Sequence, residues 1–379
     1  MLTECHCGHL QRSVTRPVAQ HTSARNPKPI RSTADFARHV GLARTTVSRV
    51  LNGQPGLKQK TIDRVKRAMD ETGFTPNAYA LHLKGKRTAS IGICMESLFT
   101  PPAVAKLAML QRRMRIREIS SLIEVVDTES SRSVIRHFLS MRVSAVVFIG
   151  HFSEPELTLR IDELSSHGVP HLVVDQAGVP NANTVALDRR RAMAEMTRHL
   201  LGLGHVSFGL LGLSGTPRSI QDRLGGMAEA LSAAGLALES STLSLDHLHP
   251  RTSGDLEFGR ALSRSFLAVK RVPTAFVALN DEIAVGAIHG FQEAGLRIPE
   301  DLSISGFNNQ DICKMIMPTL TSVDQQIEAT VEAAADFLIS KIGHPIPRHP
   351  VVRTIQPLLV VRDSTAKARS SVAIRSRQG

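Results

Sequence analysis

Short apolar runs alternate with stretches of helical periodicity over residues 89–362, and this alternation limits the possible folds more than any other feature of the chain. A short run that is apolar on both faces is typical of a strand buried in a parallel sheet. The strands are expected at 90–95, 144–150, 170–175, 208–213, 275–280 and 301–307, and the helices at 103–118, 191–202, 220–235, 282–295 and 325–341. The pattern predicts an α/β body of two doubly wound parallel-sheet subdomains, with ligands bound at the carboxyl ends of the strands.

A different pattern occupies residues 30–76, where three short helices are predicted in succession. The first begins after Ser32, a residue type favoured as an N-cap, and ends near Gly41. The second is the stretch "ARTTVSRVLN" (43–52), and the third covers roughly 58–72 and ends at Gly73. A helix, a tight turn with glycine and a second helix form the helix-turn-helix pattern.

The second of these helices has a polar face that does little for a core. Its polar residues are Arg44, Thr45, Thr46, Ser48 and Arg49. A plain three-helix bundle with solvated faces would also fit the pattern. However, the cation in the first turn opposes the helix dipole, and hydroxyl and guanidinium groups suit phosphates and base edges. We therefore predict that this helix lies in the major groove of DNA.

The net charge of +12 is concentrated in the N-terminal part of the chain. Residues 1–88 contain 16 basic and 5 acidic residues, whereas the remaining residues have a surplus of a single positive charge. This asymmetry indicates a nucleic-acid-binding headpiece attached to a nearly neutral body.

Several classes of protein are excluded by what the sequence lacks. No apolar run approaches about 18 residues, so neither secretion nor a membrane span is expected. The cysteines are scattered and form no disulfide framework, which fits a reducing cytoplasm. The "CHCGH" stretch near the N-terminus has spacings too short for a tetrahedral zinc site. We expect no metal and no cofactor, and a cytoplasmic, nucleoid-associated protein.

Enzyme motifs are also missing. "GLGHVSFG" lacks the glycine spacing of a dinucleotide fingerprint, and "GLSG" is one residue short of a nucleophile elbow. No glycine-rich loop ends in Gly-Lys-Ser/Thr. An α/β enzyme would leave the basic headpiece without a purpose, so no enzymatic activity is expected.

Residues 32–84 resemble the DNA-binding headpiece of the lactose/galactose repressor family of bacterial transcription regulators. The resemblance rests on "TTVSRVLNG" and "GFTPNAYALHLKG". It continues in the body through "GLGHVSFGLLG", "RLGGMAEALSAAGL", "PTAFVALNDEIAVGAIHGFQEAGLRIPEDLSISGFNN" and "PTLTSVDQQ". It implies a body like that of periplasmic sugar-binding proteins, in which two α/β subdomains, crossed three times by the chain, enclose a ligand cleft.

Composition and the resemblance together divide the chain into five segments. They are a disordered basic arm (1–29), a helix-turn-helix domain (30–76), a hinge helix and linker (77–88), an effector-binding and dimerisation domain (89–362) and a flexible tail (363–379). The hinge residues that match those in the minor groove are Asn77, Ala80, Leu83 and Lys84. In this interpretation Leu83 is an apolar wedge that kinks the DNA. Ala43 departs from the family, where a serine often caps the recognition helix.

The same resemblance implies an effector site in the body. The matching residues are Asp175, Asp188, Arg189, Arg223, Asn280, Asn308 and Gln325. Arg223 is expected to hold ligand oxygens. Asp281, which follows a strand end, is equally compatible with a helix N-cap and a ligand-binding role.

Asn308 bears on the class of effector. Many relatives have an aspartate there, which hydrogen-bonds neutral sugar hydroxyls, and the amide removes a charge that would repel an anion. The stretch "DICKMIMP" also resembles the gluconate-operon repressors of the family. We expect a sugar acid or its phosphate in preference to a neutral sugar, although drift at a tolerant position would also explain the residue.

Taken together, these features predict an effector-responsive transcriptional regulator, most simply a repressor, that binds double-stranded operator DNA as a homodimer. Two headpieces would reach half-sites about one helical turn apart. The alternative is an architectural protein that bends DNA from the minor groove. Such a protein would explain the headpiece and Leu83, but it would not explain a large body of the sugar-binding kind.

Overall fold

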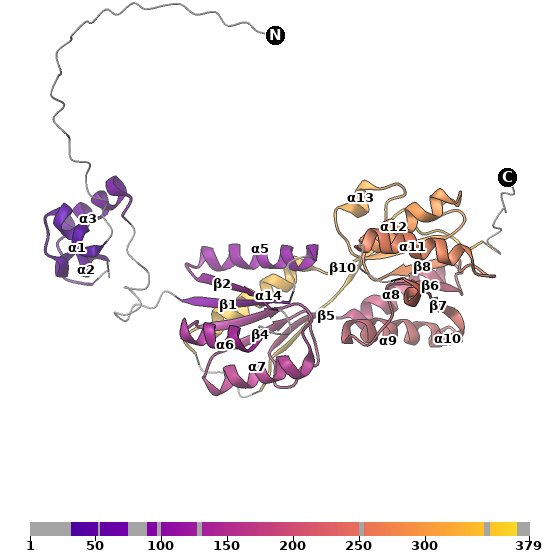
Figure 1. Cartoon of the computed structure of the whole chain (residues 1–379), viewed down its shortest axis with the longest axis horizontal. Coiled ribbons are helices and arrows are strands. Elements are labelled where there is room, and N and C mark those ends of the chain that lie inside the picture. Colours follow the sequence, from indigo (N-terminus) through magenta and orange to yellow (C-terminus); the bar gives the residue numbers. More distant parts are fainter. Residues whose placement is uncertain are drawn as a thin grey trace, which may run out of the picture. The chain divides into compact units, whose positions relative to one another are not determined.

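The structure, a computed structural model, describes residues 32–51, 54–74, 89–96, 100–126, 131–249, 254–344 and 349–369 (Figure 1). The chain separates into two compact units, residues 1–87 and residues 88–379. The predicted arm (1–29) and the hinge (77–88), with Asn77, Ala80, Leu83 and Lys84, lie outside the described residues. No helix in the described part is long and apolar enough to cross a membrane.

The first unit contains the three predicted helices, α1 (Thr33–Val40), α2 (Arg44–Leu51) and α3 (Gln59–Thr72). The Ser32 Oγ accepts a hydrogen bond from the Asp35 backbone N–H at 3.1 Å, which confirms the predicted N-cap. Gly41 and Gly73 end their helices with φ of 70° and 64°, the left-handed backbone that glycine adopts without a Cβ penalty. Helix boundaries in this unit therefore follow from local hydrogen bonding and backbone freedom.

A small core joins the three helices. Phe36 and Phe74 stack with ring centroids 4.3 Å apart, and Val47 and Val65 are completely buried beside them. The Arg64 guanidinium donates to the Val40 carbonyl at 2.6 Å, which satisfies an unpaired group at the end of α1. The apolar side chains of α2 therefore pack in this core, and the polar face of α2 takes no part in it.

The first subdomain of the second unit is a six-stranded parallel sheet with the order β11-β5-β4-β3-β1-β2. Its strands are β1 (Ser90–Met95), β2 (Ser120–Val125), β3 (Ala145–Ile149), β4 (His171–Val174), β5 (Thr184–Leu187) and β11 (Val352–Ile355). The helices α5 (Pro101–Ile116) and α14 (Ile327–Lys341) pack on one face, and α6 (Ser131–Ser140) and α7 (Glu154–Ser166) pack on the other (Figure 1).

The second subdomain has the sheet order β12-β10-β9-β8-β6-β7, with only β12 antiparallel to its neighbour. Its strands are β6 (Phe208–Leu211), β7 (Thr242–Ser244), β8 (Ala275–Ala278), β9 (Ser303–Asn308), β10 (Thr321–Asp324) and β12 (Leu358–Val360). One face is covered by α8 (Arg189–Gly202) and α9 (Arg218–Ala233), the other by α11 (Asp255–Leu267) and α12 (Asp281–Glu293). The short helices are α10 (Leu238–Ser241), η1 (Asp246–Leu248) and α13 (Ile312–Met315).

The chain passes between the two subdomains three times, as the resemblance implied. It crosses after β5, returns after β10 so that α14 packs on the first sheet, and crosses again between β11 and β12. The carboxyl ends of the parallel strands and these crossing segments meet in one region (Figure 1).

One expectation fails for part of the C-terminal segment. Residues 363–369 were predicted to belong to a flexible tail, but they pack on the second subdomain. The Ser364 side chain is fully buried, accepts from the Thr321 N–H at 2.9 Å and donates to the Ile304 carbonyl at 2.6 Å. The Ala368 N–H donates to the Leu203 carbonyl at 2.8 Å. The groups that residues 363–369 contact belong to distant strands and turns, so the composition of this segment does not predict the contacts.

Candidate functional site

The polar face of α2 is open to solvent in the first unit. Arg44, Thr45 and Arg49 are exposed, Thr46 and Ser48 are half-buried, and Val47 faces the core. The Arg49 guanidinium also donates to the Pro55 carbonyl at 3.3 Å, which holds the guanidinium near the following loop. The five predicted DNA-contacting residues therefore share one accessible helix, although contact with bases stays a prediction.

The second unit contains a cavity of about 880 Å³ at the carboxyl ends of the strands of both sheets. Its lining includes six of the seven predicted effector residues: Asp175, Arg189, Arg223, Asn280, Asn308 and Gln325. The remaining one, Asp188, is not part of the lining. Its Oδ1 accepts from the Arg191 N–H at 2.9 Å and so caps α8. The sequence position of Asp188 beside a crossover could not distinguish a cap from a ligand contact.

The floor of the cavity contains a buried lysine that the sequence analysis missed. The Lys106 ammonium, on α5, lies 2.6 Å from both carboxylate oxygens of Asp175 and 2.8 Å from the Gln325 Oε1. The Lys106 side chain is only 2% exposed. Burial alone would raise the pKa of Asp175, but Lys106 and Arg189 outweigh burial and lower this pKa. The Asp175 carboxylate is therefore ionised and engaged within the protein.

A signal for Lys106 did exist in the sequence. The buried positions of α5 are Ala103, Lys106, Leu110 and Met114. Their spacing of three and four residues places the lysine on the core face of an amphipathic helix. A charged residue on that face, in a helix that follows a strand, is rarely buried without a partner.

Two buried guanidinium groups line the same cavity. Arg189 and Arg223 are each 5% exposed, and their Nε atoms have no hydrogen-bond partner among the described residues. The Arg189 Nη1 donates to the Asp175 carbonyl at 2.6 Å, and the Arg223 Nη1 donates to the Leu279 carbonyl at 2.8 Å. The Arg223 Cζ lies 3.8 Å from the centroid of the Phe307 ring.

Arg223 differs from Arg189 in having no anionic partner. None of the ion pairs in the described part of the chain involves it. Burial, reinforced by the charge of Arg189, lowers the pKa of Arg223 to about 9. A buried cation without a counter-ion is costly, so the geometry favours a ligand that supplies acceptor oxygens.

Asp281 has neither of the two roles expected for it, which were a helix N-cap and a ligand-binding residue. Asn280, the residue before it, provides the cap. Asn280 is the N-cap of α12, because its Oδ1 accepts from the Ile283 N–H at 2.9 Å, and its amide also donates to Asp255. Asp281 is fully buried outside the cavity, where it accepts from the Ser322 Oγ at 2.6 Å and the Gln310 N–H at 2.9 Å. Asp281 therefore anchors the chain after β9, and it is neither the cap nor a cavity residue.

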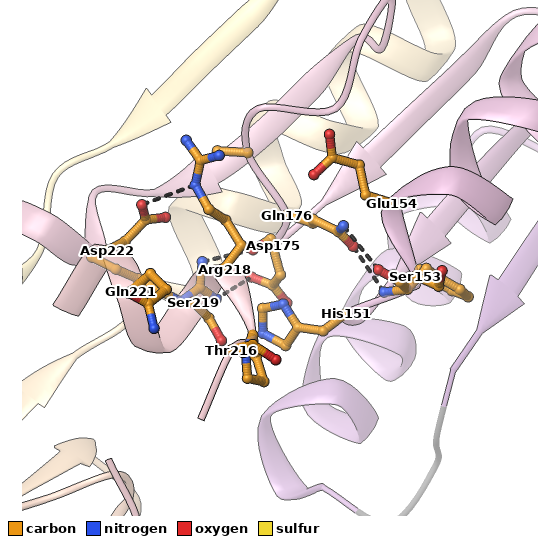
Figure 2. A pocket seen from close by; sticks show the side chains of 14 residues that line it. His151, Ser153, Glu154, Asp175, Gln176, Thr216, Arg218, Ser219, Gln221 and Asp222 are labelled. Carbon is orange, nitrogen blue, oxygen red and sulfur yellow. Dashed lines mark hydrogen bonds and ion pairs between the residues drawn. The ribbon is translucent and has the colours of Figure 1, made fainter. Parts of the chain in front are cut away.

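A second chamber of about 500 Å³ adjoins the cavity and shares His151, Asp175 and Arg189 with it. Figure 2 shows this chamber, with Arg218 and Asp222 from α9 on one side and Gln176 and Glu154 on the other. Gln176 exchanges two hydrogen bonds with the Phe152 backbone, at 2.8 and 3.0 Å, and so fixes the loop after β3. The chamber offers room beside the cavity for a ligand larger than one ring.

Apart from Asp175, which pairs with Lys106, the acidic residues of the larger cavity lie nearer the solvent than the cations. Glu96 and Glu257 are exposed, and Asp255 and Glu282 are half-buried, whereas the three cations are nine-tenths buried or more. Burial raises the pKa of both Glu96 and Glu282, which weakens their negative charge. Solvent screens exposed charges more strongly than buried ones, so the deep part of the cavity is electropositive.

Comparison with known proteins identifies the two domains that contain these sites. Residues 33–77 match the model of bacterial regulatory proteins of the lacI family, and residues 197–365 match a periplasmic binding protein-like domain. The transcriptional regulator DegA of Bacillus subtilis is 29% identical over 88% of this chain and 97% of its own. Catabolite control protein A of Staphylococcus epidermidis is 29% identical over 77% of this chain and 87% of its own. Residues 33–77 thus form a DNA-binding domain of the lacI-family type, joined to a periplasmic-binding-protein-like domain.

Solved structures support the same fold. A lac repressor dimer bound to operator and the anti-inducer ONPF has a TM-score of 0.75, with 24% identity over 88% of this chain and 98% of the other. The chain accordingly combines a lacI-type helix-turn-helix headpiece with a periplasmic-binding-protein-like body, and it is a DNA-binding transcriptional regulator. The relatives are regulators, which confirms the expectation that the protein is not an enzyme.

Proposed function

We propose that this protein is a lacI-family repressor that binds operator DNA as a homodimer and changes its operator affinity when a small carbohydrate-type effector occupies the 880 Å³ cavity. The polar face of α2 supports the DNA-reading role. The two-subdomain body supports effector control, because a ligand between subdomains can favour one arrangement over another. An architectural DNA-bending protein would need no such cavity.

The effector we favour is a sugar acid or its phosphate. The observation that supports it best is the buried Arg223, whose guanidinium has no ion pair and whose Nε has no hydrogen-bond partner among the described residues. Guanidinium groups bind carboxylate and phosphate oxygens with geometry that a hydroxyl cannot match. Asn308 adds a neutral amide where many relatives have an anionic carboxylate. The screened acidic residues nearer the solvent do not cancel this deep positive charge.

The crossing segments offer a route from the cavity to the subdomain arrangement. Arg189 and Gln325 line the cavity and lie on the first and second crossings. The guanidinium of Arg191, two residues after Arg189, donates to the Gln356 Oε1 at 2.7 Å on the third crossing. We propose that ligand binding shifts these segments and, through residues 77–88, alters the spacing of the two headpieces. This is coupling between two sites in the sense of linkage.

Arg49→Ala should weaken binding to the specific operator by about 1–3 kcal/mol and leave non-specific DNA binding largely intact, because a base contact is lost while most phosphate contacts remain. Fluorescence anisotropy with operator and with competitor DNA measures both affinities. Arg115→Ala removes an exposed cation from the body and should change neither. Equal losses on both DNAs would mean that Arg49 contacts only phosphate. A wild type with no preference over competitor DNA would favour the architectural protein.

The wild type should bind D-gluconate or its 6-phosphate at least tenfold more tightly than glucose, because a buried guanidinium pairs with an anion but not with a hydroxyl. Isothermal calorimetry with the full-length protein measures the difference. Asn308→Asp should weaken the acids more than any neutral sugar, since it adds a charge of the same sign as the ligand. Tighter binding of neutral sugars by the wild type would contradict the proposed effector class.

A further inference from the structure

Lys106 is held in the cavity floor by three short contacts that use every one of its donors. Two go to the Asp175 carboxylate at 2.6 Å and one goes to the Gln325 Oε1 at 2.8 Å. The lysine on α5 and the glutamine on the second crossing are 219 positions apart in the chain. A buried ammonium of this kind does more than balance Asp175, because its third contact reaches an uncharged amide.

That third contact determines which way the Gln325 amide points. An ammonium has donors only, so the amide oxygen must face Lys106 and the amide nitrogen must face away. The nitrogen donates to the Asn308 Oδ1, and this hydrogen bond determines the orientation of the second amide in the same manner. The Asn308 Nδ2 is thereby left with no hydrogen-bond partner among the described residues, in the lining of the cavity.

The series of hydrogen bonds from Lys106 through Gln325 to Asn308 has a chemical consequence. Each acceptor oxygen in it already accepts a hydrogen bond from within this series, and the group left without a partner among the described residues, the Asn308 Nδ2, is a donor. The Asp175 carboxylate is occupied as well, since both its oxygens contact Lys106. The deep part of the cavity thus offers the Asn308 Nδ2 and the guanidinium groups of Arg189 and Arg223, but few acceptors.

We propose that Lys106 is a specificity-determining residue, which orients the Gln325 and Asn308 amides so that the cavity presents donors and selects ligands whose buried groups only accept hydrogen bonds. Carboxylate and phosphate oxygens accept only, whereas each sugar hydroxyl must also donate. A hydroxyl in this part of the cavity would have to donate to an oxygen that already accepts a hydrogen bond, and a poorly paired buried polar group is costly. The inference rests on the proposed carbohydrate-acid effector and names the residues that set its preference.

The test removes the lysine without leaving a buried acid unpaired. The variant Lys106→Met/Asp175→Asn keeps the local net charge unchanged and frees the Gln325 amide to rotate. Calorimetry on the full chain with D-gluconate and with glucose should show that the preference for the acid falls at least tenfold. Lys314→Met, which removes an exposed lysine elsewhere in the body, should leave the preference unchanged. Urea unfolding confirms that the variants fold.

A double-mutant cycle separates the orienting role from a general effect on packing. In the wild type, Asn308→Asp replaces the oriented donor by an acceptor and adds a charge. In the Lys106→Met/Asp175→Asn background only the charge matters, because the amide is no longer held in one orientation. The loss of gluconate affinity caused by Asn308→Asp should therefore be at least fivefold smaller in that background, since residues of one network are not additive.

Each outcome of the calorimetry and of the double-mutant cycle either supports or contradicts the role of Lys106. A reduced preference together with non-additivity supports the inference. If the wild type binds gluconate and the lysine variant keeps the same preference, or if the cycle is additive, Lys106 is only structural and the proposed function stands. If the wild type binds neither gluconate nor its 6-phosphate, the proposed effector class fails, and this inference fails with it.

Discussion

Arg223→Met should weaken binding of D-gluconate by about 2–5 kcal/mol, which is roughly thirtyfold or more in Kd. The reason is that the guanidinium is buried, has no carboxylate partner in the described part of the chain and keeps its Nε unsatisfied until a ligand arrives. The ligand-free protein should not lose stability, because removing a buried unpaired charge offsets the lost contacts with Leu279 and Phe307. Calorimetry measures the affinity, and urea unfolding measures the free energy of the ligand-free variant.

Arg190→Met is the matched control for this prediction. Arg190 lies on α8 beside Arg189, but its side chain is 54% exposed and pairs with Glu229 at the surface. A surface ion pair contributes little to stability, so neither affinity nor stability should change measurably. An Arg223→Met variant that binds gluconate as tightly as the wild type would remove this residue from the site. A large loss of stability in the ligand-free variant would show that the contacts of Arg223 stabilise the core.

Gly286→Ala should destabilise the body by about 2–3 kcal/mol, even though alanine is the better helix former by about 1 kcal/mol. Gly286 lies where α12 crosses α11, and a Cβ there would sit 1.9 Å from the Leu256 carbonyl oxygen. Gly259 on α11 makes the reciprocal approach, since its Cβ would meet the Ile283 carbonyl at 2.1 Å. Both obstacles are backbone atoms, so the helices must separate. Chemical denaturation of the full chain measures the change.

Gly202→Ala is the same substitution in a permissive place. Gly202 ends α8, is exposed, and has nothing within 4 Å of an added Cβ. The variant should be as stable as the wild type or slightly more so, because alanine reduces the entropy of the unfolded chain. Equal effects of the two substitutions would contradict the close contact between α11 and α12, because helix propensity alone would then explain both results.

Much of the fold is determined by features that lie within a few residues of one another in the sequence. The Ser32 cap and the glycines that end α1 and α3 act over three or four positions, so the headpiece could be predicted almost to its boundaries. The strands β1, β3, β4, β6, β8 and β9 are buried and lie where the apolar runs predicted them. The other six strands were not predicted: β2, β7, β11 and β12 have no fully buried residue, and the buried β5 and β10 are only four residues long and begin with threonine.

The sequence by itself determined the two-part architecture, the polar face of α2 and, through the family resemblance, six residues of the cavity. Only the tertiary structure decided what those residues do. Asp188 caps a helix, Asp175 pairs with Lys106, and Arg223 has no counter-ion in the part of the chain that the structure describes. The physical reason is the separation along the sequence over which each interaction acts. Caps, turns and periodicity are local, whereas the contacts of Lys106 join positions 69 and 219 residues apart, and no pattern along the chain records which distant groups a fold brings together.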